Sequence, residues 1–170
     1  MKTNALAVAN YFIKLAKEEG REIHLIGLVK RVYLAHGFSL AVHFRGLLDP
    51  RFDVVEAWKY GPVIPSVYHS FKQYKNAPIT DMVSNLQYDE AKDEVDWVTP
   101  ILTDKDDILI VKSVWARYKN FTDSDMIKLT HQKGTPWSLC YVEGKNNRIP
   151  DDITGGFYYL IYKKIKNNGN

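Results

Sequence analysis

The sequence predicts a mainly α-helical fold with a minor β element, an α+β domain that is compact and contains one short β-hairpin. Apolar residues recur at helical spacing over most of the chain, and two short strand-like runs lie in its middle. No linker or internal repeat divides the 170 residues, of which 45% are apolar and 25% charged, as in an ordinary globular domain. We therefore expect a single domain over residues 1–170.

Two amphipathic helices are predicted at the start of the chain, over residues 4–19 and 24–36. Each carries apolar side chains at the spacing of one helical face. Thr3 or Asn4 suits the N-cap of the first helix, because a short polar side chain there can accept a hydrogen bond from a free backbone N–H. Gly37 is expected to end the second helix.

The middle of the chain changes pattern. Residues 52–60 fit either a short strand or a distorted helix, and the pair Gly61-Pro62 breaks whichever forms. Pro65 is well placed in the first turn of a third helix, which we expect over residues 65–75.

The second half of the chain is expected to contain a hairpin and several helices. Residues 85–88 and 95–98 are the two strand-like runs. Thr103 is predicted to cap a helix that is apolar almost all round, and such a helix is usually central and buried. Residues 144–148 read as a loop. Thr122 or Asp123 is expected to cap a short helix that runs to His131, and Pro136 to start another turn or short helix. A last helix is expected to close the chain, with Phe157, Tyr158, Ile161 and Ile165 on one face.

The charge pattern does not indicate a nucleic-acid-binding protein. The net charge of +3 is mild, and the only tight lysine cluster lies in the C-terminal tail. Lys30 and Arg31 are the nearest candidates for a DNA-reading helix, but we expect them on its solvated face. Any binding to nucleic acid is therefore expected to be weak and to disappear as salt rises.

The chain is expected in the cytoplasm. It has no signal-peptide pattern and no apolar run near the roughly 20 residues that span a bilayer, so no membrane association is predicted. Cys140 is the single cysteine, which excludes an intramolecular disulfide, and its apolar neighbours are typical of a buried, inert thiol.

No catalytic pattern stands out. The five histidines do not have the spacing of a helical zinc-protease motif, and neither a glycine-rich phosphate loop nor a nucleophile elbow occurs. We therefore predict no enzymatic activity, no cofactor and no metal. The alternative is a mobile-element-encoded enzyme whose site is assembled in space around His36 and His131.

The most specific segment is Glu-Ala-Trp-Lys-Tyr-Gly-Pro-Val-Ile-Pro at positions 56–65. It places Trp58 and Tyr60 directly before the Gly-Pro break, and these two rings can share one face of a strand. They either clamp the third helix onto the first two or leave a ring open as an anchor for a partner, as Trp and Tyr often do.

Four separated motifs, in order, resemble the Panacea domain family, found in the SocA and GepA type of antitoxin that is encoded beside toxins and in prophages. They are Val-Ala-Asn-Tyr-Phe-Ile at 8–13, Lys-Arg-Val-Tyr-Leu-Ala-His-Gly at 30–37, the segment at 56–65, and the pairs Thr-His and Pro-Trp at 130–131 and 136–137. The positions that carry the resemblance are Tyr33, His36, Glu56, Trp58, Gly61, Pro62, Pro65, Tyr68, His131, Pro136 and Trp137.

The resemblance implies an antitoxin of a toxin-antitoxin or prophage-borne module. Such a protein neutralises a cognate toxin, encoded by a neighbouring gene, through direct protein–protein binding and needs no catalytic group. The candidate toxin contacts are Trp58, Tyr60, His131 and Trp137. Homo-oligomerisation is compatible with this function.

Overall fold

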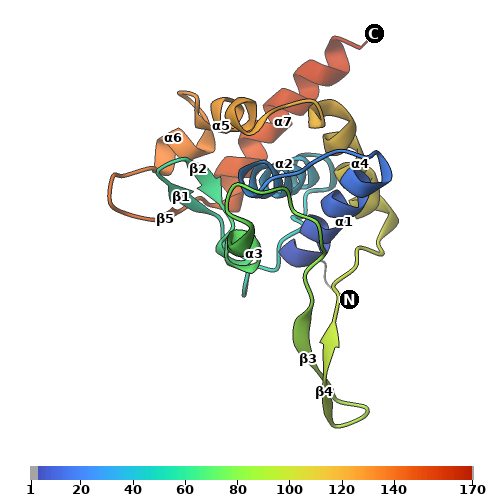
Figure 1. Cartoon of the computed structure of the whole chain (residues 1–170). Coiled ribbons are helices and arrows are strands. Elements are labelled where there is room, and N and C mark those ends of the chain that lie inside the picture. The colour runs from blue at the N-terminus through green and yellow to red at the C-terminus, as the bar shows by residue number, and fades with distance from the viewer. Residues whose placement is uncertain (1–3, 170) are drawn as a thin grey trace.

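The computed structural model describes residues 4–169 and confirms a mainly α-helical fold with a minor β element (Figure 1). The helices in this part of the chain are α1 (Ala5–Glu18), α2 (Leu25–His43), α3 (Pro65–Phe71), α4 (Lys105–Tyr118), α5 (Asp123–His131), α6 (Pro136–Cys140) and α7 (Asp151–Asn167), with a 3₁₀ turn η1 at Lys72–Tyr74. The strands are β1 (Glu56–Trp58), β2 (Gly61–Val63), β3 (Asn85–Asp89), β4 (Glu94–Val98) and β5 (Asn147–Arg148).

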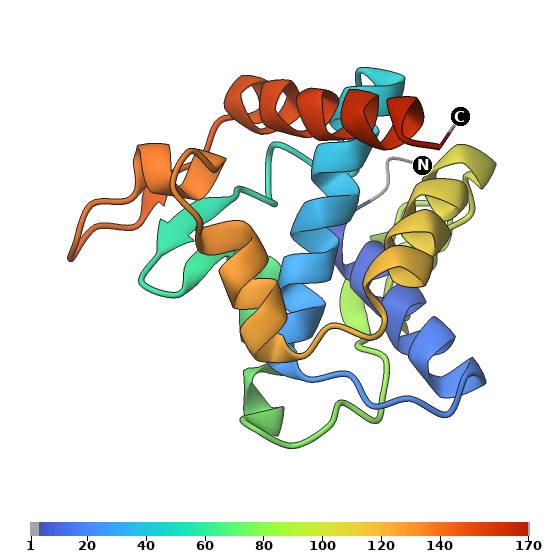
Figure 2. The ribbon, with the colours of Figure 1, turned by 90° about the horizontal axis from the view of Figure 1, so that it is seen from above.

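Helix α2 is the centre of the fold. It packs against α1, α3, α4, α5, α7 and β2. Figure 2 shows it in the middle of the molecule, with α5 and α4 on opposite sides and α7 crossing its C-terminal half. Of its 19 residues, 15 are buried, including polar ones, so α2 has no continuous solvated face.

The predicted end of the second helix at Gly37 is wrong, since α2 continues to His43 and ends at Phe44, which adopts a left-handed conformation (φ 54°). Gly37 serves close packing instead. A Cβ at this position would lie 2.3 Å from Cδ2 of Tyr158 on α7, so only glycine lets the two helices approach this closely.

The expected solvated position of Lys30 and Arg31 is also wrong, because both side chains are buried. The Arg31 guanidinium donates hydrogen bonds from Nη2 to the carbonyl oxygens of Tyr118, at 2.8 Å, and Phe121, at 3.0 Å. It thereby satisfies carbonyls at and just beyond the end of α4, as a basic side chain near a helix C-terminus can do.

The helix after residue 104 is not the central one. Leu109 on α4 is 61% exposed, so part of the apolar surface of this helix faces solvent. Helix α2 takes the central place instead. The cap is Asp104 rather than Thr103: its Oδ1 accepts from the backbone N–H groups of Asp106 and Asp107. At the start of α1, Asn4 is confirmed as the cap, and Thr3 lies outside the described residues.

Within residues 52–60, Glu56–Trp58 form a strand, β1, and no distorted helix forms. Strand β1 pairs antiparallel with β2, with Trp58 opposite Gly61, and on its other edge with β5. The predicted loop at 144–148 is therefore wrong at its end, where Asn147 and Arg148 form the two-residue strand β5. The predicted third helix is confirmed as α3 followed by η1.

The predicted hairpin at 85–88 and 95–98 is confirmed as β3 and β4, which pair only with each other in the described structure. Figure 1 shows this hairpin projecting from the helical body.

Helix α2 is also the one described helix that is long and apolar enough to cross a membrane, contrary to the expectation that no apolar run approaches that length. Of the most apolar 18-residue stretch of this helix, 83% is buried inside the fold. The core helix of a globular protein passes the same test of length and composition.

Candidate protein-binding site

The segment 56–65 contains a tight β-hairpin, which Lys30 of α2 connects to the core. Gly61 adopts φ +105°, and a Cβ there would lie 2.7 Å from Nζ of Lys30. The buried Lys30 amine donates a hydrogen bond of 2.8 Å to the carbonyl oxygen of Pro62. Burial lowers the pKa of Lys30 from its ordinary 10.5 to about 7.

His131 and Trp137 also contact the turn of this hairpin. The Trp137 indole N–H donates to the carbonyl oxygen of Trp58 at 2.7 Å, and His131 Nε2 lies 3.2 Å from the carbonyl oxygen of Lys59. The two rings stack with centroids 3.5 Å apart. Since Trp137 is only 7% exposed, these residues act as a clamp that orients Trp58 and Tyr60.

Trp58 and Tyr60 do not share one face of a strand, because β1 ends at Trp58 and Tyr60 lies in the turn. Trp58 is half-buried, packs edge-to-face on Tyr68 of α3 with centroids 5.1 Å apart, and donates from Nε1 to Glu56 at 2.7 Å. Tyr60 is 63% exposed, with the Lys59 amine 5.6 Å from its ring centroid. Trp58 packs on α3, as the clamp role requires, and is also partly open to solvent, as the anchor role requires. Tyr60 is exposed and has only the geometry of an anchor.

A groove of about 570 Å³ lies where these side chains meet α2, α3 and η1. We call it the aromatic groove. Trp58, Tyr60 and Tyr68 line it, together with apolar residues of α2 and four lysines, Lys30, Lys59, Lys72 and Lys75. No Asp or Glu is among the described residues that line it. Lys59, Lys72 and Lys75 were not predicted as site residues, although Lys59 lies inside the segment 56–65 and Lys72 and Lys75 follow it within ten residues.

The other motif residues lie in the interior and support the framework. His36 is buried, and its Nδ1 accepts from the backbone N–H groups of Leu47 at 3.2 Å and Leu48 at 3.4 Å. Its Nε2 lies 3.0 Å from Oδ1 of Asp151, so the ring is protonated at Nε2 and ties the loop after α2 to α7. This hydrogen bond from His36 holds the pKa of the Asp151 carboxyl below its ordinary value.

Tyr33 packs edge-to-face on Tyr158, and Pro65 and Pro136 occupy the first turns of α3 and α6. These positions fix where the helices begin and how they pack. The motif residues of this chain therefore do not form one surface.

His36 and His131, the two residues of the alternative hypothesis, make their described contacts with different residues: His36 with Leu47, Leu48 and Asp151, and His131 with Lys59 and Trp137. Within residues 4–169, no group of three or more His, Cys, Asp or Glu side chains is arranged to hold a metal ion. Cys140 is half-buried rather than buried, and burial raises the pKa of its thiol.

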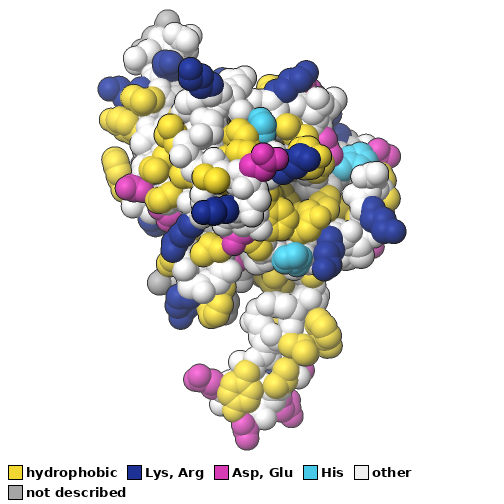
Figure 3. All heavy atoms as spheres, turned by 90° about the vertical axis from the view of Figure 1, so that its left-hand side faces the viewer, with side chains coloured by type: hydrophobic (Ala, Val, Ile, Leu, Met, Phe, Trp, Pro, Cys, Tyr) yellow, Lys and Arg dark blue, Asp and Glu magenta, His cyan; other side chains and the backbone are white. Residues whose placement is uncertain are grey.

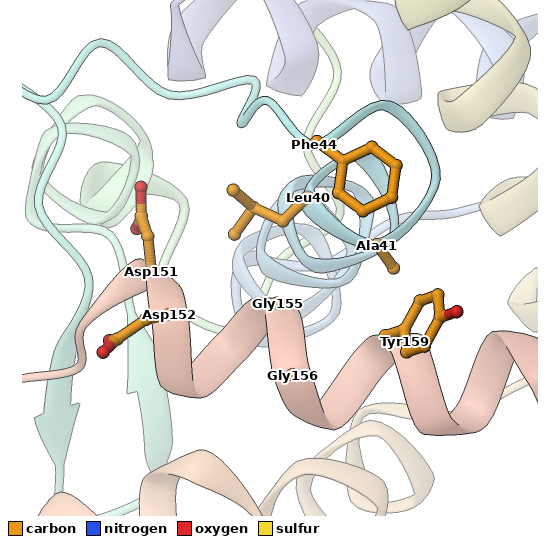
Figure 4. Close-up of a pocket in the computed structure, with 8 residues that line it drawn as sticks. All are labelled: Leu40, Ala41, Phe44, Asp151, Asp152, Gly155, Gly156 and Tyr159. Atoms are coloured by element: carbon orange, nitrogen blue, oxygen red, sulfur yellow. The ribbon is translucent and has the colours of Figure 1, made fainter.

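A second hollow, of about 370 Å³, lies where the end of α2 meets α7. Figure 4 shows Leu40, Ala41 and Phe44 above the stretch of α7 where Gly155 and Gly156 leave no side chain. Of the predicted site residues, His36 alone approaches it, through Asp151. We therefore assign the candidate site to the aromatic groove.

The fold and this groove define a small helical domain with a rigidly supported aromatic and basic surface, the form expected of a protein-binding module. The model of the family "Antitoxin SocA-like, Panacea domain" matches residues 28–138, more than half of the chain. The chain belongs to this family.

A curated relative is similar over most of its length. It is "Antitoxin SocA" of Caulobacter vibrioides (strain NA1000 / CB15N), which is 30% identical over 136 residues, covering 80% of this chain and 69% of that protein. No solved structure matches.

Proposed function

We propose that this chain is a cytoplasmic antitoxin that neutralises a cognate protein toxin by binding it directly, and that the aromatic groove is part of the contact surface. One observation carries the proposal: an exposed tyrosine and a half-buried tryptophan are presented on a hairpin whose turn is held by Lys30, His131 and Trp137. The family membership and the relative named as an antitoxin support it.

The rigidity of the hairpin is what makes it suitable for binding. Side chains that are already ordered lose little conformational entropy when a partner docks, so more of the contact energy appears as affinity. Truncation of an aromatic anchor residue at the centre of an interface typically costs about 2 kcal/mol or more of binding free energy. His131 and Trp137 act in this proposal mainly by positioning Trp58 and Tyr60.

The proposal requires a toxin gene next to this one. Expression of that gene alone is expected to arrest growth, and co-expression with this chain to restore it. The Tyr60→Ala variant is expected to weaken rescue, because it removes the most exposed ring of the groove without touching the core.

Phe52→Ala is the matched control, since Phe52 is 73% exposed but is not among the residues that line the groove. Both variants are expected to keep the melting temperature of the wild type. Equal rescue by all three proteins would remove the groove from the contact surface. Absence of rescue by the well-expressed wild type would overturn the antitoxin function itself.

A further inference from the structure

The β3–β4 hairpin carries an apolar face that nothing in the described structure covers. Leu86 pairs with Trp97 and Tyr88 with Val95 across the two strands, so all four side chains lie on one face. Their exposed fractions are 56%, 71%, 58% and 59%. A two-stranded hairpin is marginally stable alone, and an apolar face of this kind normally marks an interaction site.

The base of this hairpin is fixed to the core by one buried side chain. Asn10 on α1 donates from Nδ2 to the carbonyl oxygens of Val83, at 2.9 Å, and Pro100, at 3.0 Å. Its Oδ1 accepts from the Val83 N–H at 2.9 Å. Both legs of the hairpin are thus held by the same residue, and the strands extend from the body as a supported arm.

The end of the arm is acidic. Between positions 89 and 96 there are five carboxylates and a single lysine, Lys92. Figure 3 shows the arm at the bottom of the molecule, with hydrophobic side chains along it and acidic ones around its tip. The carboxylates are Asp89, Glu90, Asp93, Glu94 and Asp96.

The aromatic groove has the complementary chemistry. Its walls are apolar and aromatic, its charged lining residues are all lysines, and Lys59, Lys72 and Lys75 are exposed at its rim. A cavity of about 570 Å³ has room for a large aromatic side chain such as that of Trp97. Both halves of a contact, an acid-tipped apolar arm and a lysine-rimmed aromatic groove, are therefore present on one chain.

We propose that the β3–β4 arm of one molecule docks in the aromatic groove of a second copy of this chain. Docking covers the apolar face and places the carboxylates of the tip near the lysines of the rim. The contact joins two different surfaces, so it is head-to-tail, and it closes into a ring only if two or more such contacts fit together. An interface as small as one hairpin is expected to be weak, which makes the association reversible and dependent on concentration.

Sedimentation velocity of the full chain tests this directly, from low micromolar to near-millimolar concentration. The wild type is expected to associate as concentration rises, and more weakly as salt rises, because the rim contacts are screened. Trp97→Asp is expected to remain monomeric throughout. Leu109→Asp replaces another exposed apolar residue, 61% exposed on α4, and is expected to associate like the wild type.

Charge reversal gives a test that leaves the apolar face of the hairpin unchanged. Glu90→Lys/Glu94→Lys/Asp96→Lys changes the net charge between positions 89 and 96 from −4 to +2, and Lys72→Glu/Lys75→Glu makes the rim acidic, so each variant is expected to lose self-association. Mixing the two is expected to restore it, because the basic arm of one then faces the acidic rim of the other.

A wild type that stays monomeric at every concentration would overturn the proposal, as would association that survives Trp97→Asp or is not restored by mixing. If the chain is monomeric and Trp97→Asp instead abolishes toxin rescue, the arm contacts the toxin and self-docking is wrong. The sedimentation and mixing results do not require that the antitoxin function hold.

Discussion

At the scale of single residues, the shape of the aromatic groove depends on one close approach between Gly61 and Lys30. The positive φ of Gly61 turns the chain so that the Pro62 carbonyl meets the Lys30 amine. A lysine is tolerated in the interior here because its amine donates to that carbonyl and can lose its proton near neutral pH.

Gly61→Ala is expected to destabilise the protein by about 1–3 kcal/mol, since alanine is strained at this φ and its Cβ would clash with the lysine amine. Urea unfolding measures the change. Gly156→Ala is the control, because a Cβ there meets nothing within 4 Å and alanine favours a helix. Equal stability of Gly61→Ala and the wild type would show that the turn does not need its glycine.

Lys30 makes a specific contribution to the pH dependence of stability. Burial lowers its pKa to about 7 in the fold, against 10.5 as an ordinary value, so between these pH values the unfolded chain binds the proton and the folded chain does not. The contribution of Lys30 to the free energy of unfolding therefore rises from pH 7 towards pH 10.5.

Lys30→Met is expected to remove this rise, which is measured as the difference between the wild-type and variant pH profiles from urea unfolding. Lys14→Met, at a half-exposed lysine of α1, should leave the wild-type profile in place. Parallel profiles for the wild type and Lys30→Met would contradict the depressed pKa.

At the scale of elements, the sequence predicts best what depends on local pattern. The helices α1, α3 and α5, and the β3–β4 hairpin, follow from apolar spacing, caps and turn residues, and the structure confirms them. The capping box of α5, between Thr122 and Asp125, is an interaction over three residues and is readable in the sequence.

What escapes prediction depends on partners far along the chain. The sequence predicts that Lys30 and Arg31 are solvated, because their hydrogen-bond acceptors are distant in the chain. The acceptor of Lys30, the Pro62 carbonyl, is 32 residues away, and the acceptors of Arg31 are about 90 residues away. Gly37 reads as a helix end because the ring that needs its space belongs to α7. The candidate site was likewise predictable in its aromatic residues, but not in the lysines that line the groove.

A single buried amide, that of Asn10, bonds both legs of the β3–β4 arm at its root. Asn10→Ala leaves the N–H and carbonyl of Val83 and the carbonyl of Pro100 without this partner, with an expected cost of about 1–3 kcal/mol. Hydrogen exchange is expected to speed up through β3 and β4 while the amides of β1 and β2 keep their protection.

Ser84→Ala is the matched control at the same root, since its hydroxyl bonds Thr99 in an exposed position. That variant should exchange like the wild type. If Asn10→Ala also does, the arm is held by contacts other than this amide.

At the scale of the whole molecule, the two surfaces that we propose as functional are not independent. The aromatic groove is the proposed toxin contact and also the proposed seat of the arm of a second copy. Given both proposals, the toxin and the arm of a second copy compete for one groove. Addition of the toxin is therefore expected to convert associated antitoxin into a complex in which the toxin occupies the groove of a single antitoxin.

Light scattering coupled to size-exclusion chromatography measures this conversion, with the mass of the antitoxin alone as reference. Growth of larger assemblies that contain both proteins would mean that the groove stays occupied by the arm when the toxin binds elsewhere.

The central claim is that this chain acts by binding a protein toxin directly, and titration calorimetry of the purified chain with the purified product of the neighbouring gene tests it most directly. A defined stoichiometry with a Kd in the micromolar range or tighter is predicted, weakened at least tenfold by Tyr60→Ala and unchanged by Phe52→Ala. Rescue of growth without any detectable complex would contradict the claim.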